Sequence, residues 1–186
     1  MKKELPELPA EKRVRYKKDF NIKDEDIESY INDLELGAWF EKIAEILKDK
    51  DKIKTASNYI TSDYIGLKKI QKEALLPSVG NFAELINLVT ENKISSRAAK
   101  DILAMIVLKD ESPLKIAIEK NLLQKNDEGE LKVIVKKIIN ENPEIITVYK
   151  NGKENAIMSL VGKIIKESNG SANPQIVIKL LKEMLK

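Results

Sequence analysis

The segment LVGKIIKESNGSANP at residues 160–174 places a helix, a helix stop and a second helix start in immediate succession. Its apolar residues recur three and four positions apart, which is the spacing of one helical face. Asn169 and Gly170 are residue types that adopt the left-handed conformation at a helix C-terminus. Asn173 before Pro174 predicts an N-cap followed by proline at the first helical position. We therefore expect an exposed bend between two helices.

This bend is also a specific candidate for a binding site. Lys163 and Lys166 approach the end of the first helix, where positive charge is favoured. Free backbone amides beside two ammonium groups would bind a phosphate. The alternative is a tight structural turn with a solvated lysine rim, because most capping signals are only structural. The candidate binding residues are Lys163, Lys166, Asn169, Gly170, Ser171 and Asn173.

Helical periodicity continues through the rest of the chain. Hydrophobic residues make up 42% and charged residues 34% of the 186 positions, but aromatic residues only 5%. This composition favours amphipathic helices over sheets. One long helical pattern runs from about Lys52 to Glu73 and includes no strand signal. The sequence therefore predicts an all-α fold.

Two breaks divide the expected fold. The sequence LPSVG at residues 76–80 ends the long helical pattern, and the polar connector KNDEG at residues 125–129 separates the last helices. We expect a helical domain over residues 1–76, a first helical tail subdomain over residues 77–126, and a basic helical bundle over residues 127–186.

Positive charge is concentrated in the last part of the chain. Residues 131–186 contain ten lysines and five acidic residues, a net charge of +5, whereas residues 1–130 carry −2. A basic excess of this kind indicates a polyanionic partner, although a solvated helical surface has the same composition. A second basic run at residues 12–18 could contact nucleic acid, but its acidic neighbours lie close enough to neutralise it, so we expect a solvated or internally paired helix there.

The chain contains neither cysteine nor histidine. This composition excludes disulfides, Cys/His zinc sites, thiol nucleophiles and imidazole bases in this chain. An enzyme built on acidic residues would need two carboxylates that converge in a pocket. The candidates at residues 25–28 and 127–130 stand in loops or at helix starts, where acidic residues stabilise the helix dipole, so no catalytic or metal-binding residue is expected.

The hydrophobic pattern argues against a membrane protein. No apolar run reaches the length of a membrane span, and the start MKKELPELP lacks the apolar region of a signal peptide. A cytoplasmic protein is the simplest interpretation.

Three separated motifs carry a family resemblance: ELPELPAEKRVRY at residues 4–16, KISSRAAKDIL at 93–103 and YKNGKENAIMSLVGKIIKESNGSANP at 149–174. In this order they resemble the C-terminal region of GatB, the B subunit of the tRNA-dependent amidotransferase, and the later part is also similar to YqeY proteins. The resemblance implies a helical domain that follows the catalytic cradle, and then a YqeY-like tail of two small helical bundles. The chain would begin near the end of the cradle.

The resemblance also implies a division of labour. The cradle uses ATP and magnesium to activate Glu-tRNA(Gln) or Asp-tRNA(Asn), an amidase partner supplies ammonia from glutamine, and the tail holds the outer corner of the tRNA. The amidase and small subunits would join through the cradle. Without it, this chain is expected to be non-catalytic and to need no cofactor, although the parent would be a subunit of an ATP-dependent ligase. The alternative is a helical protein–protein interaction module similar to YqeY proteins, without tRNA function.

The family pattern around the bend is close to GQVMKxxxGKANP. The matching positions are Gly162, Lys166, Gly170, Ala172, Asn173 and Pro174. Lys163 replaces the usual glutamine, Ile165 replaces methionine, and Ser171 replaces a lysine. One positive charge is therefore gained and another lost, which makes Lys163 and Lys166 the preferred phosphate contacts.

Overall fold

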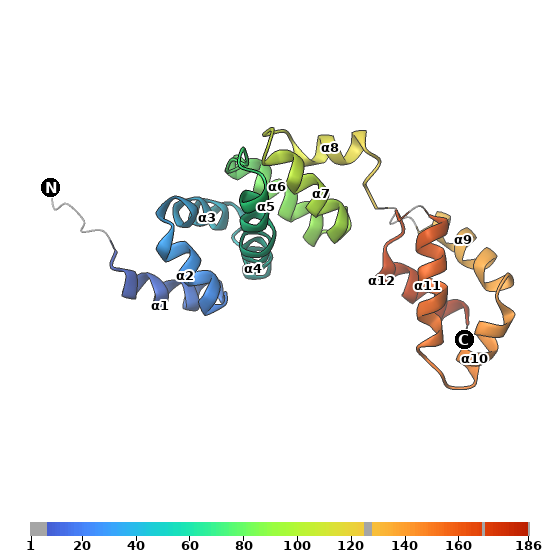
Figure 1. The fold of residues 1–186 in the computed structure, drawn as a ribbon. Helices are drawn as coiled ribbons and strands as arrows, with labels where there is room; N and C mark the ends of the chain where they lie inside the picture. Colours follow the sequence, from blue (N-terminus) through green and yellow to red (C-terminus); the bar gives the residue numbers. More distant parts are fainter. Residues whose placement is uncertain (1–6, 125–127, 169, 186) are drawn as a thin grey trace. The chain divides into compact units, whose positions relative to one another are not determined.

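The computed structural model describes residues 7–124, 128–168 and 170–185. Within these residues the named elements are helices, and an isolated β-bridge joins Ile94 to Leu123, so the predicted all-α fold is confirmed. The chain forms two compact units (Figure 1). Unit 1 comprises Met1–Glu91 and Ser96–Glu119, and unit 2 comprises Asn92–Ser95 and Lys120–Lys186. The three-part division expected from the sequence stays a prediction.

The helices follow one another with short connections. In chain order, unit 1 contains α1 (Pro9–Phe20), α2 (Asp24–Asn32), α3 (Leu34–Leu47), α4 (Lys50–Asn58), the π-helix η1 (Tyr59–Tyr64), α5 (Ile65–Ile70), α6 (Val79–Thr90), α7 (Ser96–Ile106) and α8 (Pro113–Glu119). Unit 2 contains α9 (Glu128–Asn140), α10 (Pro143–Lys150), α11 (Ala156–Glu167) and α12 (Pro174–Met184).

Aromatic side chains form the core between the first three helices. Tyr16, Tyr30 and Phe40 are fully buried, one from each of α1, α2 and α3. The rings of Tyr30 and Phe40 stack with their centroids 4.3 Å apart, and Tyr16 meets both rings edge-on. Although the chain has few aromatic residues, this cluster concentrates their large apolar area at one point.

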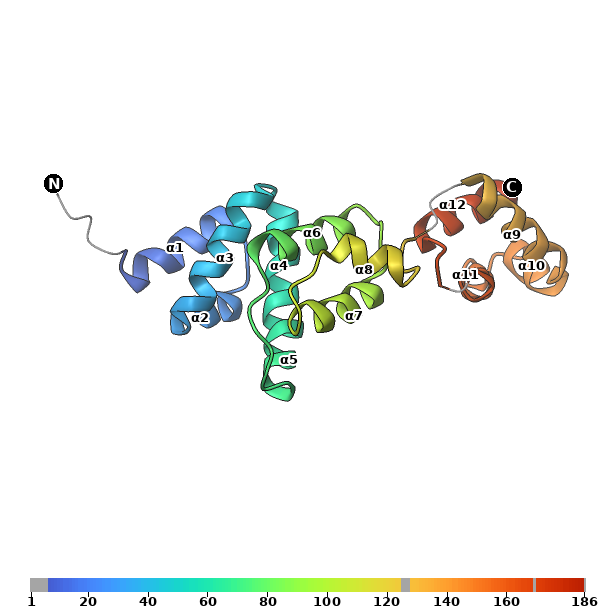
Figure 2. The same cartoon turned by 90° about the horizontal axis from the view of Figure 1, so that it is seen from above.

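The long helix expected from about Lys52 is interrupted by a π-helical turn. The wider turn of η1 brings Tyr59, Ile60 and Tyr64 to the buried side. Beyond it, α5 extends away from the other helices of unit 1 (Figure 2), and none of its residues is buried. The predicted helical pattern is therefore correct in type, but it ends at Ile70 rather than Glu73.

Trp39 joins α3 to α6 and to the loop before it. Its ring contacts Phe82 edge-on at 4.7 Å, and its indole N–H donates a 2.8 Å hydrogen bond to the carbonyl of Pro77. Lys52 of α4 donates a further hydrogen bond to Asn87 of α6 at 2.7 Å. Helices on either side of residues 76–80 therefore pack together within unit 1.

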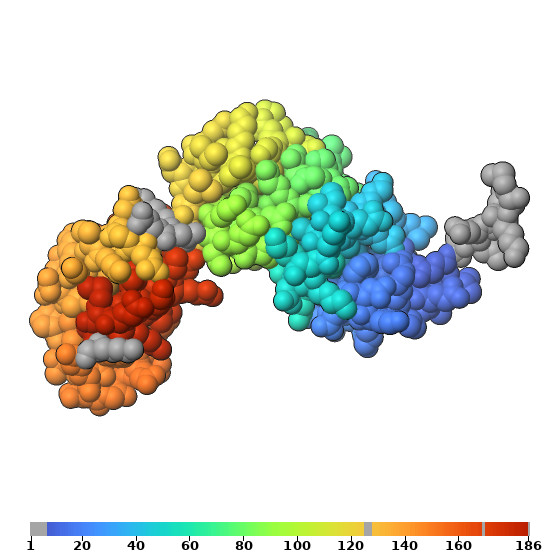
Figure 3. Space-filling view, turned by 180° about the vertical axis from the view of Figure 1, so that it is seen from behind, coloured from blue at the N-terminus to red at the C-terminus, as the bar shows by residue number. Residues whose placement is uncertain are grey.

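Unit 2 encloses its own apolar core. Each helical face places leucine, isoleucine or valine inward at three- and four-residue spacing. The fully buried members are Leu131, Val135, Leu160, Ile164, Val177, Leu180 and Leu181. Figure 3 shows the side chains of α12 packed beside those of α9. This packing fixes which faces of α10 and α11 remain outside.

Candidate nucleic-acid interface

The predicted bend after α11 has the expected backbone conformation. Gly170 has a φ of +79°, and its N–H donates to the carbonyl of Ile165 at 2.8 Å. This bond across six residues ends the helix in the manner expected of a left-handed glycine. Asn169, the other predicted stop residue, lies outside the described residues.

The backbone amides of Gly170, Ser171 and Ala172 are not free. The N–H of Ser171 donates to the carbonyl of Ser168 at 3.1 Å, and the N–H of Ala172 donates to Oγ of Ser168 at 3.0 Å. The hydroxyl of Ser171 donates to the same carbonyl at 2.6 Å. The expectation of free donors at this corner is therefore wrong for these residues, because Ser168 occupies them.

Asn173 is the predicted N-cap of α12, and this prediction is confirmed. The side chain is buried, and its Oδ1 accepts a 3.0 Å hydrogen bond from the N–H of Gln175. Pro174 follows at the first helical position. Asn173 therefore has a structural role in the turn, and Ser171 is likewise engaged within it.

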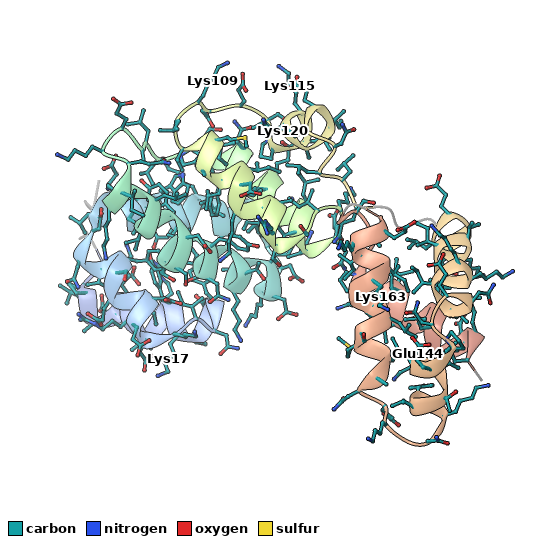
Figure 4. All side chains as sticks on the ribbon, turned by 45° about the vertical axis from the view of Figure 1, so that its right-hand side comes forward. Lys17, Lys109, Lys115, Lys120, Glu144 and Lys163 are labelled. Atoms are coloured by element: carbon teal, nitrogen blue, oxygen red, sulfur yellow. The ribbon has the colours of Figure 1, made fainter. Side chains whose placement is uncertain are left out.

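Lys163 lies away from the bend. Its ammonium group donates to Oδ1 of Asn142, which stands at the corner between α9 and α10. Asn142 is only 5% exposed, and its side-chain amide donates to the carbonyl of Ile138 at 2.7 Å. Figure 4 shows Lys163 on the side of α11 that faces the start of α10, where Glu144 is labelled. The two lysines therefore do not form a rim around the bend.

Lys163 and Lys166 instead line one hollow in the surface of unit 2. Its volume is about 540 Å³, and its lining residues are Ile138, Glu141, Asn142, Lys163, Lys166 and Glu167. Glu167 forms a 2.5 Å ion pair with Lys137 on α9. Among the described residues, neither Lys166 nor Glu141 has an ion-pair partner. The hollow therefore presents two ammonium groups and one carboxylate without an ion-pair partner among the described residues.

Sequence reasoning did not identify Asn142 and Glu141 as part of the site. The Asn-Pro pair at residues 142 and 143 indicates a helix start, and α10 does begin at Pro143, although no hydrogen bond from the Asn142 side chain caps it. That amide is used for Ile138 and Lys163 instead. Asn142 stands at an N-cap position, but its side chain does not cap α10. This missing capping bond is the feature that indicates that the side chain binds elsewhere.

The basic run of α1 is neutralised within unit 1. Arg13 pairs with Glu28 through two hydrogen bonds, Lys17 pairs with Asp24, and Arg15 pairs with Glu7. The hydrogen bond from Arg13 lowers the pKa of the Glu28 carboxyl below its ordinary value. The predicted internal pairing is therefore confirmed, and it leaves this helix a poor competitor for phosphate.

The acidic residues in the described parts of the chain do not converge on a metal site. Residues 7–124, 128–168 and 170–185 contain no group of three or more aspartates and glutamates that could hold a metal ion. Asp26 is the one buried carboxylate among them, and it accepts a hydrogen bond from Ser57. None of the described helices has the length and hydrophobicity of a membrane-crossing segment.

Comparison with known proteins gives the chain its family. The family model described as the GatB domain matches residues 38–185. The chain belongs to the GatB domain family. The resemblance seen in the sequence motifs is therefore confirmed over most of the chain.

Relatives in the GatB family extend the match to almost every residue. The B subunit of the aspartyl/glutamyl-tRNA(Asn/Gln) amidotransferase of Prochlorococcus marinus strain AS9601 is 36% identical over 98% of this chain. The B subunit of the same amidotransferase in Clostridium botulinum strain Langeland is 39% identical, also over 98% of the chain. The match covers only 37% and 38% of these two relatives, so the chain spans little more than a third of their length.

Proposed function

We propose that this chain is a non-catalytic tRNA-docking region of an amidotransferase B subunit in the cytoplasm. It would hold the outer corner of Glu-tRNA(Gln) or Asp-tRNA(Asn) during transamidation in protein synthesis. In this proposal the ATP- and magnesium-dependent step belongs to the cradle of GatB proteins, and the amidase and small subunits join through that cradle. This chain contributes shape and charge, and it needs no cofactor of its own.

The observation that carries the proposal is the pair of exposed lysines on α11 in a chain of the GatB family. Lys163 and Lys166 face the same hollow, and the helix that bears them belongs to the part of the sequence with a net charge of +5. Recognition of a folded RNA relies on shape and on contacts to phosphates and 2′-hydroxyls. Ammonium groups on a rigid helix provide such contacts without aromatic stacking.

Binding measured against ionic strength tests the proposal. Uncharged tRNA(Gln) and tRNA(Asn) are titrated into the whole chain at several salt concentrations, with an unstructured RNA of equal length as the comparison. An interface of roughly two to four phosphate contacts gives a log–log slope of about −2 to −4. Equal affinity for the folded and unstructured RNA would contradict recognition of tRNA shape.

A pair of variants locates the interface. We expect Lys163→Ala with Lys166→Ala to weaken tRNA binding and to reduce the salt slope by about 2, because each phosphate contact contributes about 1. Loss of Lys166 should hardly change the melting temperature, since exposed charges contribute little to stability. Loss of Lys163 should lower the melting temperature modestly, because it removes the donor to Oδ1 of the buried Asn142. The matched control is Lys68→Ala with Lys69→Ala, which removes two exposed charges from α5 of unit 1. If the control variant loses as much tRNA affinity as the Lys163→Ala, Lys166→Ala variant, the tRNA interface does not lie at these two lysines.

The alternative function is a helical protein–protein interaction module. An observation in its favour is that Leu114 and Ile118 on α8, and Leu108 after the end of α7, have exposed side chains. Leu114→Ser with Ile118→Ser separates the two functions. Unchanged tRNA binding in this variant supports the docking function, whereas an absence of tRNA binding in the unmodified chain would favour the interaction module.

A further inference from the structure

The hollow beside Lys163 combines groups that a phosphate site alone does not require. Lys163 and Lys166 provide ammonium groups, whereas Glu141 adds a carboxylate that would repel a phosphate. Glu167, the other lining carboxylate, is already paired with Lys137. Within the part of the chain that the structure describes, the lining groups without an ion-pair partner are Lys163, Lys166 and Glu141, and they carry one net positive charge together with one strong hydrogen-bond acceptor.

A single ribonucleotide unit matches this set of groups. Its phosphodiester carries one negative charge, and its 2′-hydroxyl is a donor that a carboxylate accepts. The volume of about 540 Å³ lies within the range of roughly 300–1,000 Å³ typical of small-ligand sites. A deoxyribonucleotide would leave Glu141 without a donor and close to a phosphate.

Asn142 gives the site a fixed geometry. It is buried, and the hydrogen bond from its amide to the carbonyl of Ile138 leaves Oδ1 facing Lys163. An ammonium group has three N–H donors, so the bond to Asn142 leaves two for a phosphate. A flexible lysine side chain held at one point loses less conformational entropy on binding.

We propose that this hollow is a ribose–phosphate site that distinguishes RNA from DNA. Lys163 and Lys166 bind the phosphate, Glu141 accepts the 2′-hydroxyl, and Asn142 is a positioning residue that acts through Lys163. The inference rests on the proposed function, because the ribonucleotide it binds is part of the docked tRNA.

Glu141→Gln tests the ribose contact. The probes are a tRNA(Gln) transcript and a DNA strand of the same sequence, each titrated into the whole chain at one ionic strength. Removing the Glu141 carboxylate removes its repulsion of the phosphates in both RNA and DNA. It also weakens the hydrogen bond accepted from the 2′-hydroxyl, and this loss affects RNA alone. We therefore expect DNA to bind several-fold more tightly and the RNA/DNA affinity ratio to fall. The same change in affinity for both probes would overturn the role of Glu141.

A double-mutant cycle tests the positioning role of Asn142. Lys163→Gln should weaken tRNA binding and reduce the salt slope by about 1, whereas the control Lys150→Gln, on α10 outside the hollow, should not match this loss. Asn142→Ala should weaken binding when Lys163 is present and have no further effect on Lys163→Gln. An equal effect in both backgrounds would show that Asn142 acts only through the fold, and the positioning role would be wrong.

Two further outcomes separate this inference from the proposed function. If the unmodified chain prefers tRNA but Lys163→Gln binds like Lys150→Gln, tRNA docking stands and the site in the hollow is wrong. If Asn142→Ala lowers the melting temperature, Glu141→Gln decides, because Glu141 is exposed and its replacement leaves the core untouched.

Discussion

Single residues decide how closely the helices of unit 1 approach. Gly37 on α3 faces the backbone of α2, and a Cβ added there would lie 2.5 Å from the carbonyl oxygen of Tyr30. Tyr30 is fully buried and stacked on Phe40, so its backbone has little freedom to shift. The absence of a side chain at Gly37 is therefore a condition for the aromatic core. The sequence around Gly37 predicts a helix correctly, but nothing local in it reveals a partner seven residues earlier.

Gly37→Ala should lower the free energy of unfolding by about 1–3 kcal/mol, which is the usual cost of overpacking. The matched control is Gly66→Ala on α5, where an added Cβ meets nothing within 4 Å. This control should raise the free energy of unfolding by about 0.5–1 kcal/mol, because alanine is the better helix former. Urea unfolding followed by circular dichroism measures both. If the two variants shift stability in the same direction, the close approach at Gly37 does not limit packing.

At the scale of elements, capping signals differ in what they achieve. Asn173 and Asn155 both precede a helix of unit 2. The side chain of Asn173 accepts a hydrogen bond from the N–H of Gln175, whereas the side chain of Asn155 makes no capping bond. The existence of α11 and α12 could be predicted from sequence, because periodicity and capping are local properties. Which asparagine caps its helix depends on the backbone geometry of the preceding turn.

We expect Asn173→Ala to lower the free energy of unfolding by about 1 kcal/mol, the typical contribution of an N-cap. Asn155→Ala, an exposed position at the start of α11, should change it by less than about 0.5 kcal/mol. Thermal and urea unfolding of both variants provide the comparison. A loss at position 155 as large as that at position 173 would mean that the missing capping bond forms in solution.

At the scale of the whole molecule, charged groups connect distant helices of unit 1. Glu41 on α3 forms ion pairs with Arg15 and, at 3.4 Å, with Lys12, and it accepts a 2.9 Å hydrogen bond from Tyr16, all three on α1. Partial burial of Glu41 raises its carboxyl pKa, but the hydrogen bonds from Arg15 and Tyr16 and the nearby positive charges lower it further, so the net shift is downward. This network ties α1 to α3.

The pH dependence of stability follows from this lowered pKa. Because the pKa of Glu41 lies below its ordinary value of 4.5, ionised Glu41 stabilises the fold fully above pH 4.5. That stabilisation is lost as the pH falls through the pKa of the folded protein. Between about pH 6 and pH 3, the free energy of unfolding should therefore fall less for Glu41→Gln than for the unmodified chain. Urea unfolding at each pH measures this difference. Glu73→Gln, which removes an exposed carboxylate without an ion pair among the described residues, is the control. A pH dependence unchanged by Glu41→Gln would contradict this role.

The sequence by itself determined the helical class, the helix stop at Gly170 and the cap at Asn173, because these depend on residues within a few positions of one another. Its motifs also determined the GatB family. Only the tertiary structure decided where Lys163 lies: its partner Asn142 is 21 positions away, and the packing of α9, α10 and α11 brings the two together. The same packing made the hollow beside Lys163 the candidate site, because contacts between distant residues depend on side-chain positions that no local pattern specifies.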